Sequence, residues 1–275
     1  MIGLFFPNRA TTAGTYSGGS WLAALPVANV GDPALAKVAR STDATIGSTK
    51  IRLDQGSARA LRAFALVNHN LSAAAQWRVL LGTTSGGSEV YAGTLADWLQ
   101  ATGFEAGLTA RGMEDGEYLR DGTHALIVLP AFYTARHVTI EITDTANANG
   151  YVQVGRIFVG GGFVPTINAS YGLQHGWKDL STKEQAESGA DWVTARRRMK
   201  KAQFVLDGTT EAEGEQLYEM QRVIGTIDEA LYVPDLVQIG VSQRYGFLGS
   251  IAEMSAIEYP YYERHRLPLS MAQKG

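Results

Sequence analysis

The sequence has no cysteine among its 275 residues. Disulfide bonds, a thiol nucleophile and a thiolate metal site are therefore excluded. No apolar run approaches the ~18 residues of a membrane-spanning helix, and the apolar start at residues 1–6 lacks the basic flank of a signal peptide. These absences predict a soluble protein that is made in a cytoplasm and does not insert into a membrane.

Charge is also scarce. Charged residues make up 19% of the chain, and the net charge of −3 corresponds to a pI near 6.0. A chain of this charge has no global attraction for nucleic acid, so a nucleic-acid partner is disfavoured. Glycine is abundant, at 31 residues, which suits short strands joined by tight turns. Low charge also suits subunits that bury surface against neighbours, and this composition is typical of an assembly component.

Local signatures of catalysis are missing from the sequence. It contains no G-x-S-x-G elbow, no H-E-x-x-H pair and no Walker loop. The acidic run at residues 114–117, with Asp121, lacks the ligand spacing of a calcium loop and is typical of a solvated loop. We therefore expect no catalytic residue, no cofactor and no metal site. A glycan hydrolase would need two carboxylates roughly 5 to 9 Å apart, a distance that the sequence does not give.

The clearest pattern in the first half lies at residues 50–70. Apolar and charged residues alternate in residues 50–54, which predicts a strand with one wet face. Gln55-Gly56-Ser57 is typical of a turn. Residues 61–67 are apolar except for Arg62, as expected of a strand in the middle of a sandwich.

Further strands are predicted at residues 76–81, 124–130, 135–142 and 151–159, with turn residues between them. Short strands without a long helix predict a β-sandwich over residues 21–162. Residues 1–20 are expected to form an N-terminal arm or an edge strand. Gly160-Gly161-Gly162 is the strongest candidate for a domain boundary or hinge.

The second half, residues 163–275, contains the clearest helix signal. Thr210 is followed three residues later by Glu213, which together predict a capping box at the start of a helix over residues 210–224. Leu217, Met220 and Ile224 fall on one face of this helix. A long strand before it, over residues 192–206, and three short strands after it predict a small split-barrel-like α+β domain with one helix.

Two groups of residues are candidate binding sites. The first is a basic segment made of Arg196, Arg197, Arg198, Lys200 and Lys201. It could contact a phosphate backbone, but a charged strand at a subunit interface or a solvated edge is favoured, because no aromatic residues alternate with the charges. The second group is Asn68, His69, Asn70 and Trp77, which could hold a sugar between amides and an indole face. Asparagines at the end of a strand more often bond their own backbone, so a turn role is favoured.

The segments Ala63-Phe64-Ala65-Leu66-Val67-Asn68-His69-Asn70-Leu71-Ser72 and Val154-Gly155-Arg156-Ile157-Phe158-Val159-Gly160 resemble galactose-binding-like jelly rolls in the structural proteins of tailed-bacteriophage tails. The second half is similar in outline to the ring-forming domain of distal-tail and tail-tube-related proteins. In the usual distal tail protein the ring domain comes first, whereas here the order is reversed. Tail-tip, baseplate and tail-terminator roles therefore stay open.

The resemblance implies a non-enzymatic virion protein that joins the tail tube to tip or receptor-binding proteins. Its expected partners are copies of itself in a ring, with a hexamer as the favoured order, and other phage tail proteins. It would be made in the bacterial host cytoplasm and end in the virion tail. The alternative is a carbohydrate-binding adhesion module that recognises a host surface glycan through the sandwich.

Overall fold

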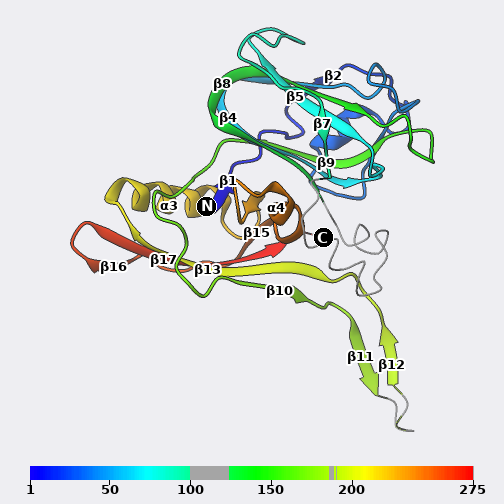
Figure 1. Ribbon diagram of the computed structural model, residues 1–275. Helices are drawn as coiled ribbons and strands as arrows, with labels where there is room; N and C mark the ends of the chain where they lie inside the picture. The colour runs from blue at the N-terminus through cyan, green and yellow to red at the C-terminus, as the bar shows by residue number, and fades with distance from the viewer. Residues whose placement is uncertain (100–123, 186–188, 190, 275) are drawn as a thin grey trace.

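The structure is a computed structural model that describes residues 1–99, 124–185, 189 and 191–274. It is mainly β, and it consists of a β-sandwich, a second unit built on one sheet with helices, and a hairpin that projects from the second unit (Figure 1). The predicted mainly β fold with a sandwich is confirmed.

One bent sheet forms the sandwich, and its strands run in the order β3-β9-β4-β8-β5-β6, with β2 added to β4 and β7 added to β5. The strands are β2 (Thr15–Ser17), β3 (Ala39–Arg40), β4 (Ile51–His69), β5 (Gln76–Gly82), β6 (Tyr91–Ala92), β7 (Ala96–Asp97), β8 (Ala125–Thr143) and β9 (Gln153–Gly160). A short 3-10 helix, η1 (Val27–Gly31), precedes β3.

The long strands β4 and β8 make both layers of the sandwich. The start of β4 pairs with the end of β8, and the end of β4 pairs with the start of β8 and with β9. The register shifts between Asp54 and Arg59, where the sequence predicted a turn. Gly56 adopts a positive φ of 76° there, so the turn residues form a bulge and the strand continues into the second layer.

The apolar run at residues 61–67 is buried on both of its faces. Leu61, Phe64 and Leu66 pack into the core between the two sandwich layers. Ala63 and Ala65, on the other face of the strand, pack against the second unit. A strand that is covered on both sides needs no polar face, which is why this segment is almost wholly apolar.

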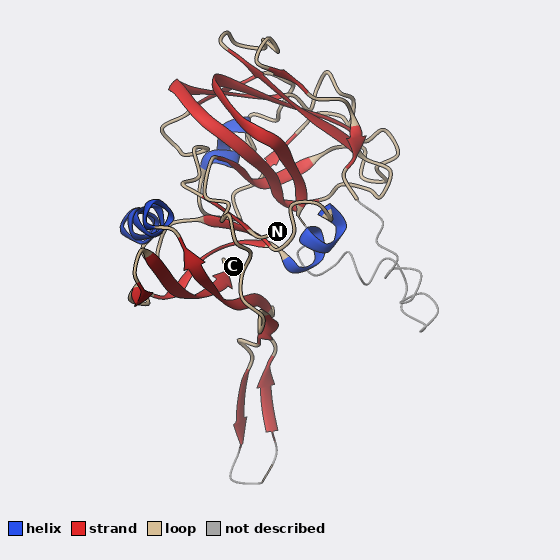
Figure 2. Ribbon diagram, turned by 60° about the vertical axis from the view of Figure 1, so that its left-hand side comes forward, coloured by secondary structure: helices blue, strands red, loops and turns tan. Residues whose placement is uncertain are grey.

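The second unit contains a seven-stranded sheet in the order β1-β14-β15-β17-β13-β10, with β16 added to β17. Its elements are β1 (Gly3–Phe5), β10 (Gln174–Lys178), β13 (Met199–Thr209), α3 (Glu211–Ile224), β14 (Ala230–Val233), α4 (Ile239–Tyr245), β15 (Phe247–Glu253), β16 (Glu258–Tyr261) and β17 (Arg264–Gln273). A separate two-stranded sheet, β11 (Thr182–Gln185) with β12 (Asp191–Thr194), forms the projecting hairpin (Figures 1 and 2).

The N-terminal residues do not form a free arm. The strand β1 is buried and pairs with β14 of the second unit, in the register Gly3 with Val233. Residues 1–20 thus supply strands to both units, because β1 pairs with β14 and β2 pairs with β4 of the sandwich. The sandwich is inserted between β1 and the rest of that unit, so a simple reversed domain order is wrong.

The helix predicted at residues 210–224 is present as α3. The Thr210 side chain accepts a hydrogen bond from the Glu213 backbone, and the Glu213 side chain accepts one from the Thr210 backbone, which completes the capping box. Leu217, Met220 and Ile224 are buried against the second sheet. The seven-residue helix α4 is a second helix, which the prediction of one helix omitted.

The two units share a buried interface. Phe5, Leu231 and Val233 of the second unit pack with Ala63, Ala65, Val67, Leu126 and Phe158 of the sandwich. At the predicted hinge, Leu4 and Phe163 exchange two backbone hydrogen bonds of 2.9 and 2.7 Å. A Cβ added at Gly162 would lie 2.3 Å from the Leu4 carbonyl oxygen, so this glycine permits close packing of the two chain segments.

Candidate functional site

The projecting hairpin is the most unusual surface of the protein. Every described residue of β11 and β12 is exposed, including Trp192 at 71% and Val193 at 64%. Among the described residues, β11 and β12 pair only with each other, and an exposed ion pair between Lys183 and Asp191, 2.6 Å apart, joins the two strands. An isolated two-stranded hairpin is marginally stable in water, so burial of this element against another surface would stabilise it.

The basic segment begins at the base of the hairpin. Arg196, Arg197 and Arg198 are exposed and lie outside both neighbouring strands, because β12 ends at Thr194 and β13 begins at Met199. The single long strand predicted at residues 192–206 is therefore wrong. Arg198 Nε lies 3.4 Å from Asp179 Oδ2 across the base of the hairpin.

The two lysines of the same segment differ in their exposure to solvent. Lys201 is exposed, but Lys200 is only 6% exposed, and its Nζ donates to the Gly246 carbonyl at 3.4 Å. Lys200 is therefore not available to a partner, which corrects its place among the interface residues. Its position on β13 explains the burial, since Ala202, Phe204 and Leu206 on the same face all point into the core.

A third exposed surface was missed by the sequence reasoning. Tyr259, Tyr261 and Tyr262, in and after β16, are 74, 76 and 90% exposed. Exposed aromatic clusters of this kind commonly mark contact surfaces. The aromatic run Tyr259-Pro260-Tyr261-Tyr262 is the sequence signal for it.

The residues predicted to contact a sugar have structural roles. Trp77 is 1% exposed inside the sandwich core, so its indole face cannot stack on a ligand. Asn68 Nδ2 donates to the Leu35 carbonyl at 2.8 Å. Asn70 Nδ2 donates to the Tyr151 carbonyl at 3.0 Å, and its Oδ1 accepts from the Gln153 backbone at 2.7 Å. These bonds join the asparagines to backbone groups far away in the sequence, not to their own turn.

The fourth residue of that group, His69, is buried against Trp98 in an edge-on contact, with ring centroids 4.7 Å apart. Burial lowers its pKa to about 4. Burial, followed by the charges of Lys200 and His69, lowers the pKa of nearby His124 to about 3. Both imidazoles are therefore neutral in the folded protein at pH 7.

Three half-buried side chains, those of Arg40, Tyr151 and Gln153, lie beside Asn70. The Arg40 guanidinium stacks on the Tyr151 ring, with its carbon 4.3 Å from the ring centroid. Arg40 Nη2 also donates to Gln153 Oε1 at 2.8 Å. An aromatic ring with amide and guanidinium groups around it is a combination that can hold a polyhydroxylated ligand.

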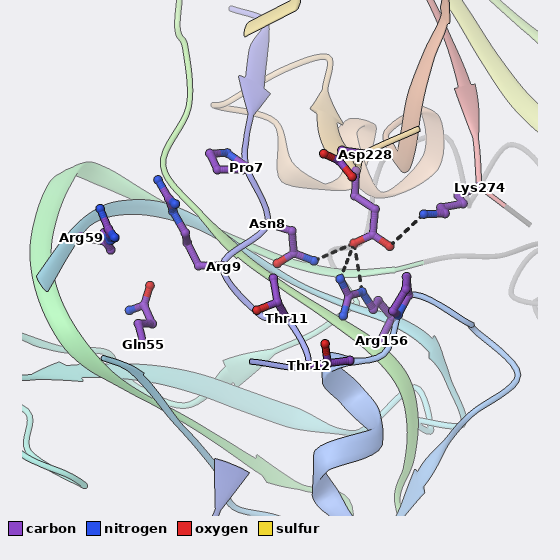
Figure 3. A pocket seen from close by; sticks show the side chains of 13 residues that line it. Pro7, Asn8, Arg9, Thr11, Thr12, Gln55, Arg59, Arg156, Asp228 and Lys274 are labelled. Atoms are coloured by element: carbon purple, nitrogen blue, oxygen red, sulfur yellow. Dashed lines mark hydrogen bonds and ion pairs between the residues drawn. The ribbon is translucent and has the colours of Figure 1, made fainter. Parts of the chain in front are cut away.

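A buried ion pair connects the sandwich to the second unit. Arg156 on β9 and Glu229 before β14 each have side chains only 4% exposed, and Arg156 Nη2 lies 2.6 Å from Glu229 Oε2. Asn8 Nδ2 donates to the same oxygen at 2.9 Å, and Lys274 Nζ lies 3.5 Å from Oε1 (Figure 3). This cluster of four side chains, here called the Glu229 cluster, lies at one side of a cleft between the two units.

Within the part of the chain that the structure describes, no group of three or more histidine or acidic side chains is arranged to hold a metal ion. The acidic run at residues 114–117 and Asp121 lie outside the described residues. No helix in the described ranges is long and apolar enough to cross a membrane.

Comparisons with known proteins match structures but not sequences. No family model and no curated protein matches this chain. A family 32 carbohydrate-binding module from C. perfringens NanJ, solved with galactose, aligns with a TM-score of 0.38 and 12% identity, over 58% of this chain and 98% of that one.

Two further structures align at a similar level. The lectin domain of lectinolysin in complex with Lewis B antigen has a TM-score of 0.37 and 13% identity, over 56% of this chain and 95% of that one. A Streptococcus pneumoniae fucose-binding module has a TM-score of 0.37 and 12% identity, over 56% and 94%.

Proposed function

We propose that this chain is a non-enzymatic structural protein of a bacteriophage tail, and that copies of it assemble into a ring through the second unit. The observation that carries the proposal is the projecting hairpin β11–β12, which buries none of its described residues within its own subunit. In the assembled ring the hairpin lies against a neighbouring copy, and the sandwich faces outward.

Burial of the apolar side chains of the hairpin supplies the free energy of this contact. Trp192 and Val193 are mostly exposed in the single chain. Fully burying a large apolar side chain contributes roughly 1.5–3 kcal/mol, so the two residues supply about 3–6 kcal/mol per subunit contact. Arg196, Arg197 and Arg198 at the base of the hairpin then meet an acidic surface of the neighbour, which fixes its orientation.

One edge of the second sheet also supports a ring. The strand β10 is one end of the sheet order, and four of its five residues are exposed, among them Trp177. The strand β1 at the other end is buried and hydrogen-bonded to Phe163, so only β10 offers an edge among the described residues. Unpaired strand edges attract another strand, and a closed ring removes them by pairing between subunits.

The test is the mass of the purified full chain by light scattering, with particle images of the same sample. The wild type is expected to form a closed ring, and Trp192→Glu with Val193→Glu is expected to give a monomer with an unchanged circular dichroism spectrum. Val237→Glu is the matched control, because Val237 is 82% exposed and lies between β14 and α4, outside the hairpin. A wild-type monomer, or a double variant that still forms the ring, would refute the proposal.

The basic segment has its own test within the same assay. Arg196→Glu, Arg197→Glu and Arg198→Glu together are expected to leave the fold intact, because all three side chains are exposed, and to lower assembly. Lys37→Glu, an exposed lysine of the sandwich, is the control for charge reversal. Assembly that is unchanged in the triple variant would show that the segment does not contact the neighbour.

Glycan binding by the sandwich is the second candidate function. The observation that favours it is the half-buried Tyr151 with Arg40 over its ring and Gln153 beside it. Galactose and Lewis B antigen, the ligands of two structural neighbours, are the first probes, followed by a glycan array on the full chain. Tyr151→Ala is expected to abolish binding and leave the thermal unfolding temperature nearly unchanged. Binding that survives this change would place the site elsewhere.

A further inference from the structure

The cleft beside the Glu229 cluster is lined by residues from both units. It has a volume of about 480 Å³ and lies between the segment that follows β1, the bulge of β4, and the residues before β14 (Figure 3). Cavities of this size at the junction of two structural units are common ligand sites. The cleft lining contains four cationic and two acidic side chains, namely Arg9, Arg59, Arg156 and Lys274 against Asp228 and Glu229.

The positive charges in the cleft fall into two classes. Arg156 and Lys274 are paired with Glu229, so their charges are balanced within the protein. Arg9 and Arg59 lie together on the other side of the cleft, away from the Glu229 cluster (Figure 3). No carboxylate of the described residues forms an ion pair with either of them. The local excess of positive charge contrasts with the net charge of −3 of the whole chain.

Arg9 and Arg59 repel each other on their side of the cleft. Burial, and then the charge of Arg59, lower the pKa of the Arg9 guanidinium. An anion between the two would remove this repulsion and would accept hydrogen bonds from both guanidinium groups. The Arg9 backbone is already fixed, because its amide donates to the Val159 carbonyl at 2.7 Å. Little ordering of the main chain is therefore needed when an anion binds.

We propose that this cleft binds a small hydroxylated oxyanion, of the class of sugar acids and sugar phosphates, through Arg9 and Arg59. The planar guanidinium groups match the oxygen geometry of a carboxylate or a phosphate. Thr11 and Thr12, both exposed in the cleft, present hydroxyl groups to the remainder of the ligand. This lining suits a polyhydroxylated molecule better than an apolar acid.

Calorimetry on the full chain tests the site, with D-glucuronate, D-glucose 6-phosphate and D-glucose as probes. At least one of the two anions is expected to bind, and D-glucose is expected not to bind measurably. Binding of only one anion identifies the carboxylate or the phosphate as the recognised group. Arg9→Gln and Arg59→Gln are each expected to weaken binding about tenfold or more, because a hydrogen bond to a charged group contributes at least that factor.

Arg222→Gln is the matched control, because Arg222 is exposed on α3 and forms an ion pair with Glu219 on the same helix. It is expected to bind the anions like the wild type. The Arg59 side chain is exposed, so Arg59→Gln is expected to unfold at the wild-type temperature, and loss of binding in it cannot be ascribed to misfolding. Failure of both anions to bind, equal binding of D-glucose, or unchanged binding in both cleft variants would overturn the proposal.

This site does not depend on ring assembly. The hairpin and the cleft share no residue, so Arg59→Gln is expected to have the wild-type mass in light scattering. A ring without anion binding refutes only the cleft proposal. Anion binding by a monomer refutes only the ring proposal.

Discussion

The sharpest stability prediction concerns Arg156, which holds the sandwich to the second unit through Glu229. In Arg156→Met the Glu229 carboxylate keeps Asn8 and Lys274 near it but loses the two arginine contacts of 2.6 and 3.0 Å. Both partners of the original pair are only 4% exposed. Breaking a buried pair by removal of one partner typically costs about 3–5 kcal/mol, because the remaining charge is left without full compensation.

The loss in the free energy of unfolding for Arg156→Met is expected near the lower end of this range, about 3 kcal/mol, because Lys274 still lies 3.5 Å from Glu229. The double variant Arg156→Met with Glu229→Met removes both charges and is expected to cost less than the single variant. Replacement of a buried pair by apolar residues is often close to neutral. Urea unfolding of the wild type, both single variants and the double variant gives the full cycle.

This cycle can refute the reasoning in two ways. A cost below about 1 kcal/mol for Arg156→Met would mean that water reaches the pair and compensates Glu229. A double variant whose cost equals the sum of the two single costs would mean that the two side chains act independently. The Arg222→Met variant, which breaks the exposed pair with Glu219, is the control and is expected to cost less than 1 kcal/mol.

Three further predictions follow from single contacts. His69 and His124 have folded pKa values of about 4 and about 3, below the usual 6.5, so the unfolded state binds more protons than the folded state below pH 6.5. The free energy of unfolding is therefore full above pH 6.5 and falls by about 1.4 kcal/mol per pH unit for each histidine between pH 6.5 and 4. Urea titrations at several pH values measure this fall, and His69→Gln is expected to reduce its slope. Gly214→Ala is expected to destabilise by about 1 kcal/mol despite better helix propensity, because its Cβ would lie 2.7 Å from His265 Cγ; a stabilised variant in urea unfolding would contradict this. Thr210→Ala is expected to cost about 1 kcal/mol by loss of the capping box, whereas Thr210→Ser should cost less when both are compared by thermal unfolding.

Local signals in the sequence were sufficient for some elements. The capping box and the apolar face of α3 depend on residues within four positions of each other, and the structure has both. The same holds for the burial of residues 61–67, where a run that is apolar except for Arg62 indicates a covered strand. The partner on its second face, the second unit, was not predictable, because that contact joins residues far apart in the chain.

Other errors came from reading residue type without position. Trp77 was considered for a sugar site, although Trp77, Val79 and Leu81 alternate with Arg78 and so share the core face of one strand. Lys200 was grouped with its charged neighbours, although it precedes Ala202 on the buried face of β13. In both cases the period of two along the strand carried the correct answer. The pairing of β1 with β14 had no such signal, because it links residues more than 200 positions apart.

The shared interface also decides how the sandwich can be studied. Separation of residues 21–162 from the rest of the chain would expose Val67, Leu126 and Phe158 together with the alanines beside them. It would also leave Arg156 buried without Glu229. An apolar face of this kind promotes aggregation, and an unpaired buried charge destabilises the fold. The same contacts hold the sandwich in a fixed orientation on the second unit. A ring formed by the second unit would therefore present every sandwich in the same orientation. Multivalent attachment requires this arrangement.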